Sequence, residues 1–201
     1  MCSPLELSLR LRHRLGRALW EMGRAEVVGL STIALLRGDR RIAPEEARFV
    51  RQMMEEESAH AAVTRGFAGS FAPRPRFPSD AFGALLEKDA MTAAAMSGDN
   101  RVAWVLATTI WNEVNTVRAY AGWIPIFGRI DAAMGEAFAR IQAEERGHVA
   151  WGQCVFARLE AENRPLLLRV KTAIRLVRRV YPAVVHQAHS GLYRELKELT
   201  E

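Results

Sequence analysis

Apolar residues recur every three or four positions along most of this 201-residue chain, and no stretch shows the two-residue alternation of a β-strand. The periodic stretches are separated by short segments rich in glycine, proline or aspartate, which are residues that end helices. This pattern predicts an all-α protein. We expect a short helix at about 80–96 and longer ones at about 5–36, from 43 to about 71, 100–123 and 130–162.

Prolines mark the expected breaks between these helices. Residues 72–78 contain three prolines and are predicted to form a long connection that crosses the bundle. Residues 124–128 include Pro125 and are predicted to turn the chain. After Asn163 a basic amphipathic helix is expected, interrupted or kinked at Pro182 and continuing toward Leu199.

Two copies of one short motif, Glu-x-x-His, lie within the apolar stripes of two predicted helices. Glu57 and His60 form the first copy, and Glu145 and His148 form the second. Residues three apart lie on the same face of a helix, so each copy can direct a carboxylate and an imidazole at one point. The alternative is that both Glu-His pairs lie on the protein surface and are solvated.

Two further glutamates lie in apolar stripes, and their spacing repeats. Glu26 precedes the first motif by 31 residues and Glu113 precedes the second by 32 residues, which predicts two similar antiparallel hairpins. Carboxylates and imidazoles are costly to bury in a core unless they are paired or bound to metal. We therefore predict six metal ligands: Glu26, Glu57, His60, Glu113, Glu145 and His148.

Other polar residues near these stripes are alternatives or neighbours of the predicted site. Glu21 is the rival of Glu26 in the first helix, but arginine and alanine surround it, whereas Met22 is among the neighbours of Glu26. Tyr120 and Thr109 share the stripe of the third long helix and are candidates to border the site. The alternatives are a packed tyrosine and a threonine bonded to its own helix.

Acids and amides off the stripes are expected outside the ligand set. Glu55, Glu56 and Glu144 have no histidine three residues later, and we expect them to face solvent or an outer layer of the site. Asn112 and Asn115 are candidate partners for the ligand histidines.

Carboxylate ligands with one imidazole per metal suit Fe(II) or Mn(II) and leave positions open for O2 or a substrate. Two reduced irons can together supply two electrons to O2, and the activated oxygen can oxidise a bound organic molecule. We expect two iron ions, with manganese or a mixed Fe/Mn pair as the alternative, and O2 as co-substrate.

The order, spacing and types of these ligands resemble the ferritin-like di-iron carboxylate superfamily over roughly residues 12–160. The resemblance implies a ferritin-like four-helix bundle with a long crossover at 1–163, and a basic helical extension at 164–201 packed on the same domain. It also implies that Glu57 and Glu145 bridge the metals, that Glu26 and Glu113 bind one metal each, and that His60 and His148 cap opposite metals.

The expected function is an O2-dependent oxygenase or oxidase acting on a small apolar, acyl-carrier-bound or coenzyme-A-bound substrate, with an external electron donor. Small residues near the ligands would leave room for a substrate channel, or would instead allow close helix packing: Gly29, Ala61, Thr64 and Gly152. The alternatives are a ferroxidase or storage protein, a rubrerythrin-like or manganese-catalase-like peroxide enzyme, and a helical binding module without metal.

Charge and cysteine content add expectations about partners and compartment. The net charge is +5, and basic residues crowd into 164–179, where an acidic protein or an anionic surface could dock, or where the helix face is simply solvated. No nucleic-acid motif accompanies them. Cys2 and Cys154 form no C-x-x-C pair, and no signal peptide or membrane span is evident, so we expect a cytoplasmic protein. A homodimer is expected, and His13, His186 and His189 are expected off the ligand stripes, on the surface or at an interface.

Overall fold

Helices take up nearly all of the chain. The computed structural model describes residues 6–74 and 81–200, with described side chains outside 81–86 and 180–188. These residues contain no strand, which confirms the predicted all-α class. The elements are α1 (Leu9–Ile33), the short 3-10 helix η1 (Ala34–Leu36), α2 (Pro44–Phe71), α3 (Ala81–Ala95), α4 (Gly98–Ile130), α5 (Ala132–Glu162) and α6 (Arg164–Thr200).

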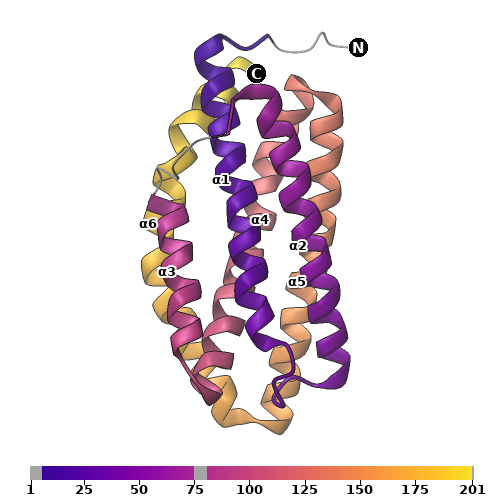
Figure 1. Cartoon of the computed structure of the whole chain (residues 1–201), viewed down its shortest axis with the longest axis vertical. Helices are drawn as coiled ribbons and strands as arrows, with labels where there is room; N and C mark the ends of the chain where they lie inside the picture. Colours follow the sequence, from indigo (N-terminus) through magenta and orange to yellow (C-terminus); the bar gives the residue numbers. More distant parts are fainter. Residues whose placement is uncertain (1–5, 75–80, 201) are drawn as a thin grey trace.

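Four long helices form two antiparallel hairpins, with α1 along α2 and α4 along α5 (Figure 1). The hairpins face each other through α2 and α5 and through α1 and α4, and these pairs approach less closely than the helices within each hairpin. α6 lies along α4 and also touches α5 and α1. α3 packs on α1, α4 and α6, so α3 and α6 together cover one side of the paired hairpins (Figure 1).

The interior is divided along the length of the hairpins. One apolar core, which includes Met53 and Leu106, fills the end where α1 stops and α2 begins. A second core, which includes Leu19 and Phe138, fills the opposite end. Glu57 and His60 of α2 and Glu145 and His148 of α5 lie in the sequence interval between these two cores. Packing at both ends therefore fixes the level at which the polar side chains meet.

The turn predicted at 124–128 is wrong, because α4 continues through Pro125. Phe127 is fully buried in the second core, and its packing compensates for the backbone hydrogen bond that a proline cannot donate. The chain turns instead at Asp131. The carboxylate of Asp131 accepts a hydrogen bond of 3.1 Å from the third backbone N–H of α5 and so caps that helix.

Three other expectations about the elements have different outcomes. The first helix begins at Leu9 rather than near residue 5. α6 is helical throughout Arg164–Thr200, so it is not interrupted at Pro182. Most of the predicted crossing segment lies at 75–80, outside the described residues. Among the described residues, no helix has both the length and the apolar composition that a membrane span requires.

Candidate metal centre

Six polar side chains from four helices meet between the two apolar cores. All six residues that the sequence singles out as ligands belong to this cluster. Five of them are at most 6% exposed, and the sixth, Glu26, borders a cavity described below. The members are Glu26 from α1, Glu57 and His60 from α2, Glu113 from α4, and Glu145 and His148 from α5.

The cluster consists of two overlapping groups of four residues. In each group, one potential ligand atom of every member lies within 4.8 Å of the others. The first group is Glu26, Glu57, His60 and Glu145, and the second is Glu57, Glu113, Glu145 and His148. Two carboxylates, those of Glu57 and Glu145, belong to both groups. The cluster therefore has the geometry to hold metal ions at two adjacent positions that share these carboxylates.

Each group takes three members from one hairpin and one from the other. Glu26, Glu57 and His60 come from the α1–α2 hairpin, and α5 of the opposite hairpin adds Glu145. The second group has the same composition with the hairpins exchanged. The Glu-x-x-His spacing produces this arrangement, because a carboxylate and an imidazole three residues apart project from one helix face.

Each imidazole of the cluster is also held from behind by a carboxylate of the opposite hairpin. Nε2–H of His60 donates to Oε2 of Glu144 at 2.6 Å, and Nε2–H of His148 donates to Oε2 of Glu56 at 2.8 Å. Nδ1 of each ring then faces the cluster, 3.3 Å from Oε1 of Glu145 for His60 and 3.1 Å from Oε2 of Glu145 for His148. A carboxylate behind a ligand histidine fixes the ring and makes its free nitrogen a better donor.

The sequence contains a signal for these outer carboxylates. Glu56 and Glu144 directly precede the glutamates of the two motifs, so both copies read Glu-Glu-x-x-His. These two residues are expected to face solvent or an outer layer of the site, and the structure gives each a specific histidine partner. The histidine partners are therefore not Asn112 and Asn115, which instead line the cavity. The repeated Glu-Glu pair, rather than the amides, marks the outer partners.

Two buried atoms in the cluster have no hydrogen-bond partner among the described residues. They are Nδ1 of His60 and Oε1 of Glu145, which lie 3.3 Å apart without hydrogen-bond geometry. A buried polar atom that lacks a partner costs free energy. A cation bound by both atoms would satisfy them, so the donors present fit a metal ion.

Burial and mutual repulsion raise the pKa of three of the four carboxyl groups. Burial is the largest cause for Glu26, Glu57 and Glu113, and the negative charge of Glu145 adds to it in each case. The pKa of Glu145 itself is lowered: burial opposes this shift, but the interactions of Glu145 with Glu113 and the two histidines outweigh it. Without metal, the cluster therefore retains protons that a bound cation would displace.

Both imidazoles hold a proton more tightly than an ordinary histidine. Burial lowers the pKa of His60 and His148, but the neighbouring carboxylates outweigh burial and raise it. Glu145 is the main carboxylate for both rings, and the outer carboxylate behind each ring adds to the effect. Metal binding through these rings should therefore become more favourable as the pH rises.

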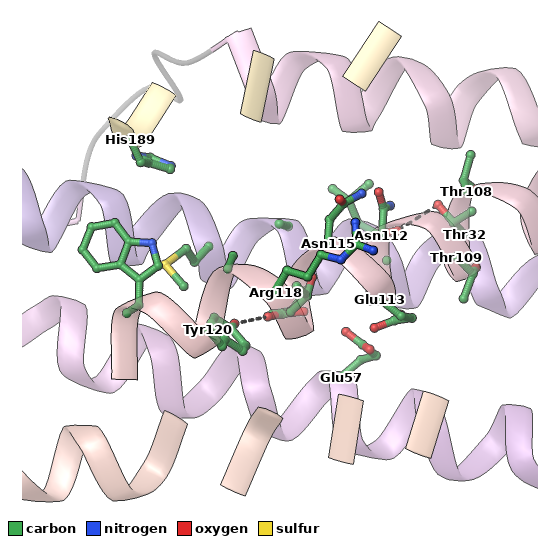
Figure 2. A pocket seen from close by; sticks show the side chains of 18 of the residues that line it. Thr32, Glu57, Thr108, Thr109, Asn112, Glu113, Asn115, Arg118, Tyr120 and His189 are labelled. Carbon is green, nitrogen blue, oxygen red and sulfur yellow. Dashed lines mark hydrogen bonds between the residues drawn. The ribbon is translucent and has the colours of Figure 1, made fainter. Parts of the chain in front are cut away.

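A cavity of about 380 Å³ borders the cluster (Figure 2). It is lined mainly by residues of α1 and α4, and α2, α3 and α6 contribute the others. Glu26, Glu57 and Glu113 form part of its wall. Tyr120, whose hydroxyl donates to Oε1 of Glu26 at 3.0 Å, and Thr109, one turn before Glu113, line it as well. Both residues that the sequence places next to the site therefore border it.

Of the four small residues considered for a channel, Gly29 lines this cavity. Gly152 instead allows close helix packing, because a Cβ atom there would lie 2.8 Å from Cγ1 of Ile110. Ala61 and Thr64 are not among the residues that line the cavity. The opening beside the cluster is thus made by α1 and α4, not by the small residues of α2 and α5.

The remaining candidates lie outside the cluster. Glu21 lies 3.7 Å from Nε2 of His189, so α1 contributes Glu26 rather than Glu21 to the cluster. His189, which is expected on the surface or at an interface, is half-buried and lines the cavity. His13 is exposed, and the side chain of His186 lies outside the described residues.

Comparison of this chain with protein-family models, curated proteins and solved structures found no match.

Proposed function

We propose that this chain is a ferritin-like di-metal carboxylate enzyme that uses O2 to oxidise a small organic molecule bound in the cavity. The observation that carries the proposal is the pair of four-residue groups that share Glu57 and Glu145 beside a cavity of about 380 Å³. Carboxylate oxygens with one imidazole for each position suit Fe(II), with Mn(II) as the alternative.

Each protein group has a distinct part in this proposal. Glu57 and Glu145 would be shared by both metal ions, and each remaining glutamate and histidine would bind one ion, following the two groups of the cluster. Tyr120 holds the carboxylate of Glu26 in place through its hydroxyl. When bound, the two metal ions would supply the redox chemistry with O2.

The reaction class balances with one external reductant. In a hydroxylation, O2, a substrate C–H bond, two electrons and two protons give a C–OH bond and one water molecule. The electrons would come from a separate donor protein. The basic outer face of α6, which carries Arg169, Arg175 and Arg179, is where we expect an acidic partner to dock.

The test is an anaerobic titration of the full chain with Fe(II), followed by admission of air with the near-ultraviolet and visible spectrum recorded. We expect saturation at about two irons per chain and a transient absorption band after oxygen enters. Uptake far beyond two irons would instead indicate an iron-storage protein. A protein that binds neither Fe(II) nor Mn(II) would refute the metal site altogether.

Two matched variants show whether the cluster is responsible for uptake. Glu57→Ala removes a carboxylate shared by both groups and should abolish binding of two metals while helicity remains. Glu55→Ala changes an exposed glutamate two residues away and should bind metal normally. Equal metal stoichiometry in the two variants would contradict the assignment.

A further inference from the structure

The cavity beside the cluster has a polar wall and an apolar end. Along α4 its wall carries Asn112, Asn115 and Arg118, which are spaced three residues apart and so form one row on the helix. Figure 2 shows these three side chains on the same wall of the cavity. At the end farther from the α4 N-terminus, Met22 of α1 and Trp123 of α4 line it. A ligand that fits this lining has both a polar group and an apolar body.

Arg118 is the cation in this wall that lacks an ionic partner. No ion pair joins it to any carboxylate of the described residues, whereas Arg24 pairs with Glu87 and Arg158 pairs with Glu46. The amide of Asn115, one turn earlier, is held by its own bond of 2.8 Å to a backbone carbonyl of α4. Arg118 is an exposed residue that lines the cavity, and its guanidinium group is thus available to a ligand bound there.

Two other charged groups line the cavity outside the cluster, His189 and Asp89. His189 lies 3.7 Å from Glu21, so it already has an acidic neighbour. Burial raises the pKa of Asp89 to about 6, so this carboxyl group is still mostly ionised at pH 7, but no ion pair joins it to Arg118 among the described residues. If the cluster binds two divalent ions as proposed, their charge offsets the four carboxylates, and Arg118 remains as a free cation facing the cavity.

We propose that the cavity binds a small organic acid, with its anionic group held by Arg118 and its apolar body against Met22 and Trp123. Guanidinium is suited to this task because its fork of N–H donors matches the two oxygens of a carboxylate. The volume of about 380 Å³ falls at the lower end of the range of about 300–1,000 Å³ that is common for small-molecule sites. The inference rests on the proposed function for its catalytic meaning, but not for the binding itself.

The position of Arg118 also indicates which part of the acid would react. Arg118 follows Glu113 by five residues, a helix rise of about 7.5 Å. Side chains on a helix lean toward its N-terminus, so the guanidinium extends from Arg118 in the direction of Glu113. A bound acid would therefore present carbons close to its anionic group, not the end of a long chain, to the cluster.

The test compares straight-chain carboxylates of about four to eight carbons with primary alcohols of the same length. Binding to the full chain, loaded with Mn(II) under anaerobic conditions, is measured by calorimetry and by the shift in melting temperature. We expect each carboxylate to bind at least about tenfold more tightly than its alcohol, which corresponds to about 1.4 kcal/mol.

Three variants test whether Arg118 causes the preference for carboxylates over alcohols. Arg118→Ala should remove the difference between acid and alcohol, and Arg118→Lys should keep part of it because the charge remains. Arg140→Ala, an exposed position in α5, should bind like the original chain. Equal affinity for acids and alcohols, or an unchanged preference in Arg118→Ala, would overturn the proposal, and the second result would place the acid on the metals instead.

Metal stoichiometry separates this inference from the proposed function. Binding of two metals without a preference for acids would support the metal centre and refute the role of Arg118. A chain that binds no metal but still prefers acids through Arg118 would refute the proposed function alone.

Discussion

At the scale of single residues, the two ligand histidines are defined by what lies on both sides of each ring. Nδ1 of His60 and of His148 faces the cluster, while Nε2 of each donates to Glu144 or Glu56. This outer bond selects the nitrogen that is left to bind metal. In the proposed metal centre the outer carboxylates would therefore be positioning residues, which would act on metal affinity without touching the metal.

Replacing either outer carboxylate by an amide should weaken metal binding. Glu144→Gln and Glu56→Gln keep the shape of the side chain but remove its charge, and we expect metal affinity to fall by about 10- to 100-fold. Competition with a coloured chelator measures the affinity. Glu55→Gln is the matched control, because Glu55 is exposed and is the neighbour of Glu56 in α2. Affinities equal to that of the control would show that the outer carboxylates do not position the rings.

The sequence made the six cluster residues predictable for a physical reason. Each of them continues an apolar stripe, so a helix that buries the stripe also buries the charged residue. Glu56 and Arg118 lie beside a stripe rather than on it, so the stripe does not mark them; the repeated Glu-Glu pair marks Glu56, and no pattern marks Arg118. Their roles depend on what the opposite hairpin or the cavity places next to them, and one helix alone does not carry this information.

At the scale of the elements, the turn between α4 and α5 depends on a close approach of two glycines. A Cβ atom at Gly135 would lie 2.6 Å from Cα of Gly128, and backbone atoms cannot move aside as a flexible side chain can. A Cβ atom at Gly128 would meet no other atom within 4 Å. An added methyl group would therefore clash at Gly135 but not at Gly128, even though the two residues face each other.

We expect Gly135→Ala to destabilise the fold by about 1–3 kcal/mol, the usual cost of an added methyl group in a tightly packed place. Gly128→Ala should be neutral or stabilise by up to about 1 kcal/mol, because alanine restricts the unfolded chain and suits a helix. Urea unfolding of the two variants and the original chain measures the difference. Equal midpoints for the two variants would show that the close approach is not tight in solution.

The same region shows why one turn was misplaced from the sequence. Pro125 and Gly128 are residues that normally end helices, and the prediction used this local preference. In the structure α4 passes through both, because Phe127 is buried in the second core and Gly128 admits α5. The periodic stripes located the helices, whereas the exact turn depended on packing between two helices.

At the scale of the whole molecule, the buried cluster links stability to pH. The pKa of Glu57 and Glu113 is raised from 4.5, and that of His60 and His148 is raised from 6.5. A group with a raised pKa adds stability below its unfolded value, and this stability is lost as the pH rises through the folded value. Glu145, whose pKa is lowered from 4.5, changes the stability only below about pH 4.5.

The metal-free protein should therefore melt at a lower temperature as the pH rises from about 5.5 to 8. Metal binding should strengthen over the same range, because the ligands must lose their protons, so the gap in melting temperature between loaded and metal-free protein should widen. Calorimetry at several pH values measures both curves. Glu113→Gln removes one of the raised carboxyls and should flatten the metal-free curve. A gap that narrows with rising pH would contradict the assigned shifts.

The crossed origin of the ligands has a mechanical consequence. Each four-residue group takes one member from the opposite hairpin, and each imidazole is held by a carboxylate from the opposite hairpin. Separating the hairpins would therefore disrupt both groups at once, and occupation of one position would draw together the pieces of the other. Ions that bind as proposed would hold the two hairpins together, so we expect them to enter and leave as a pair.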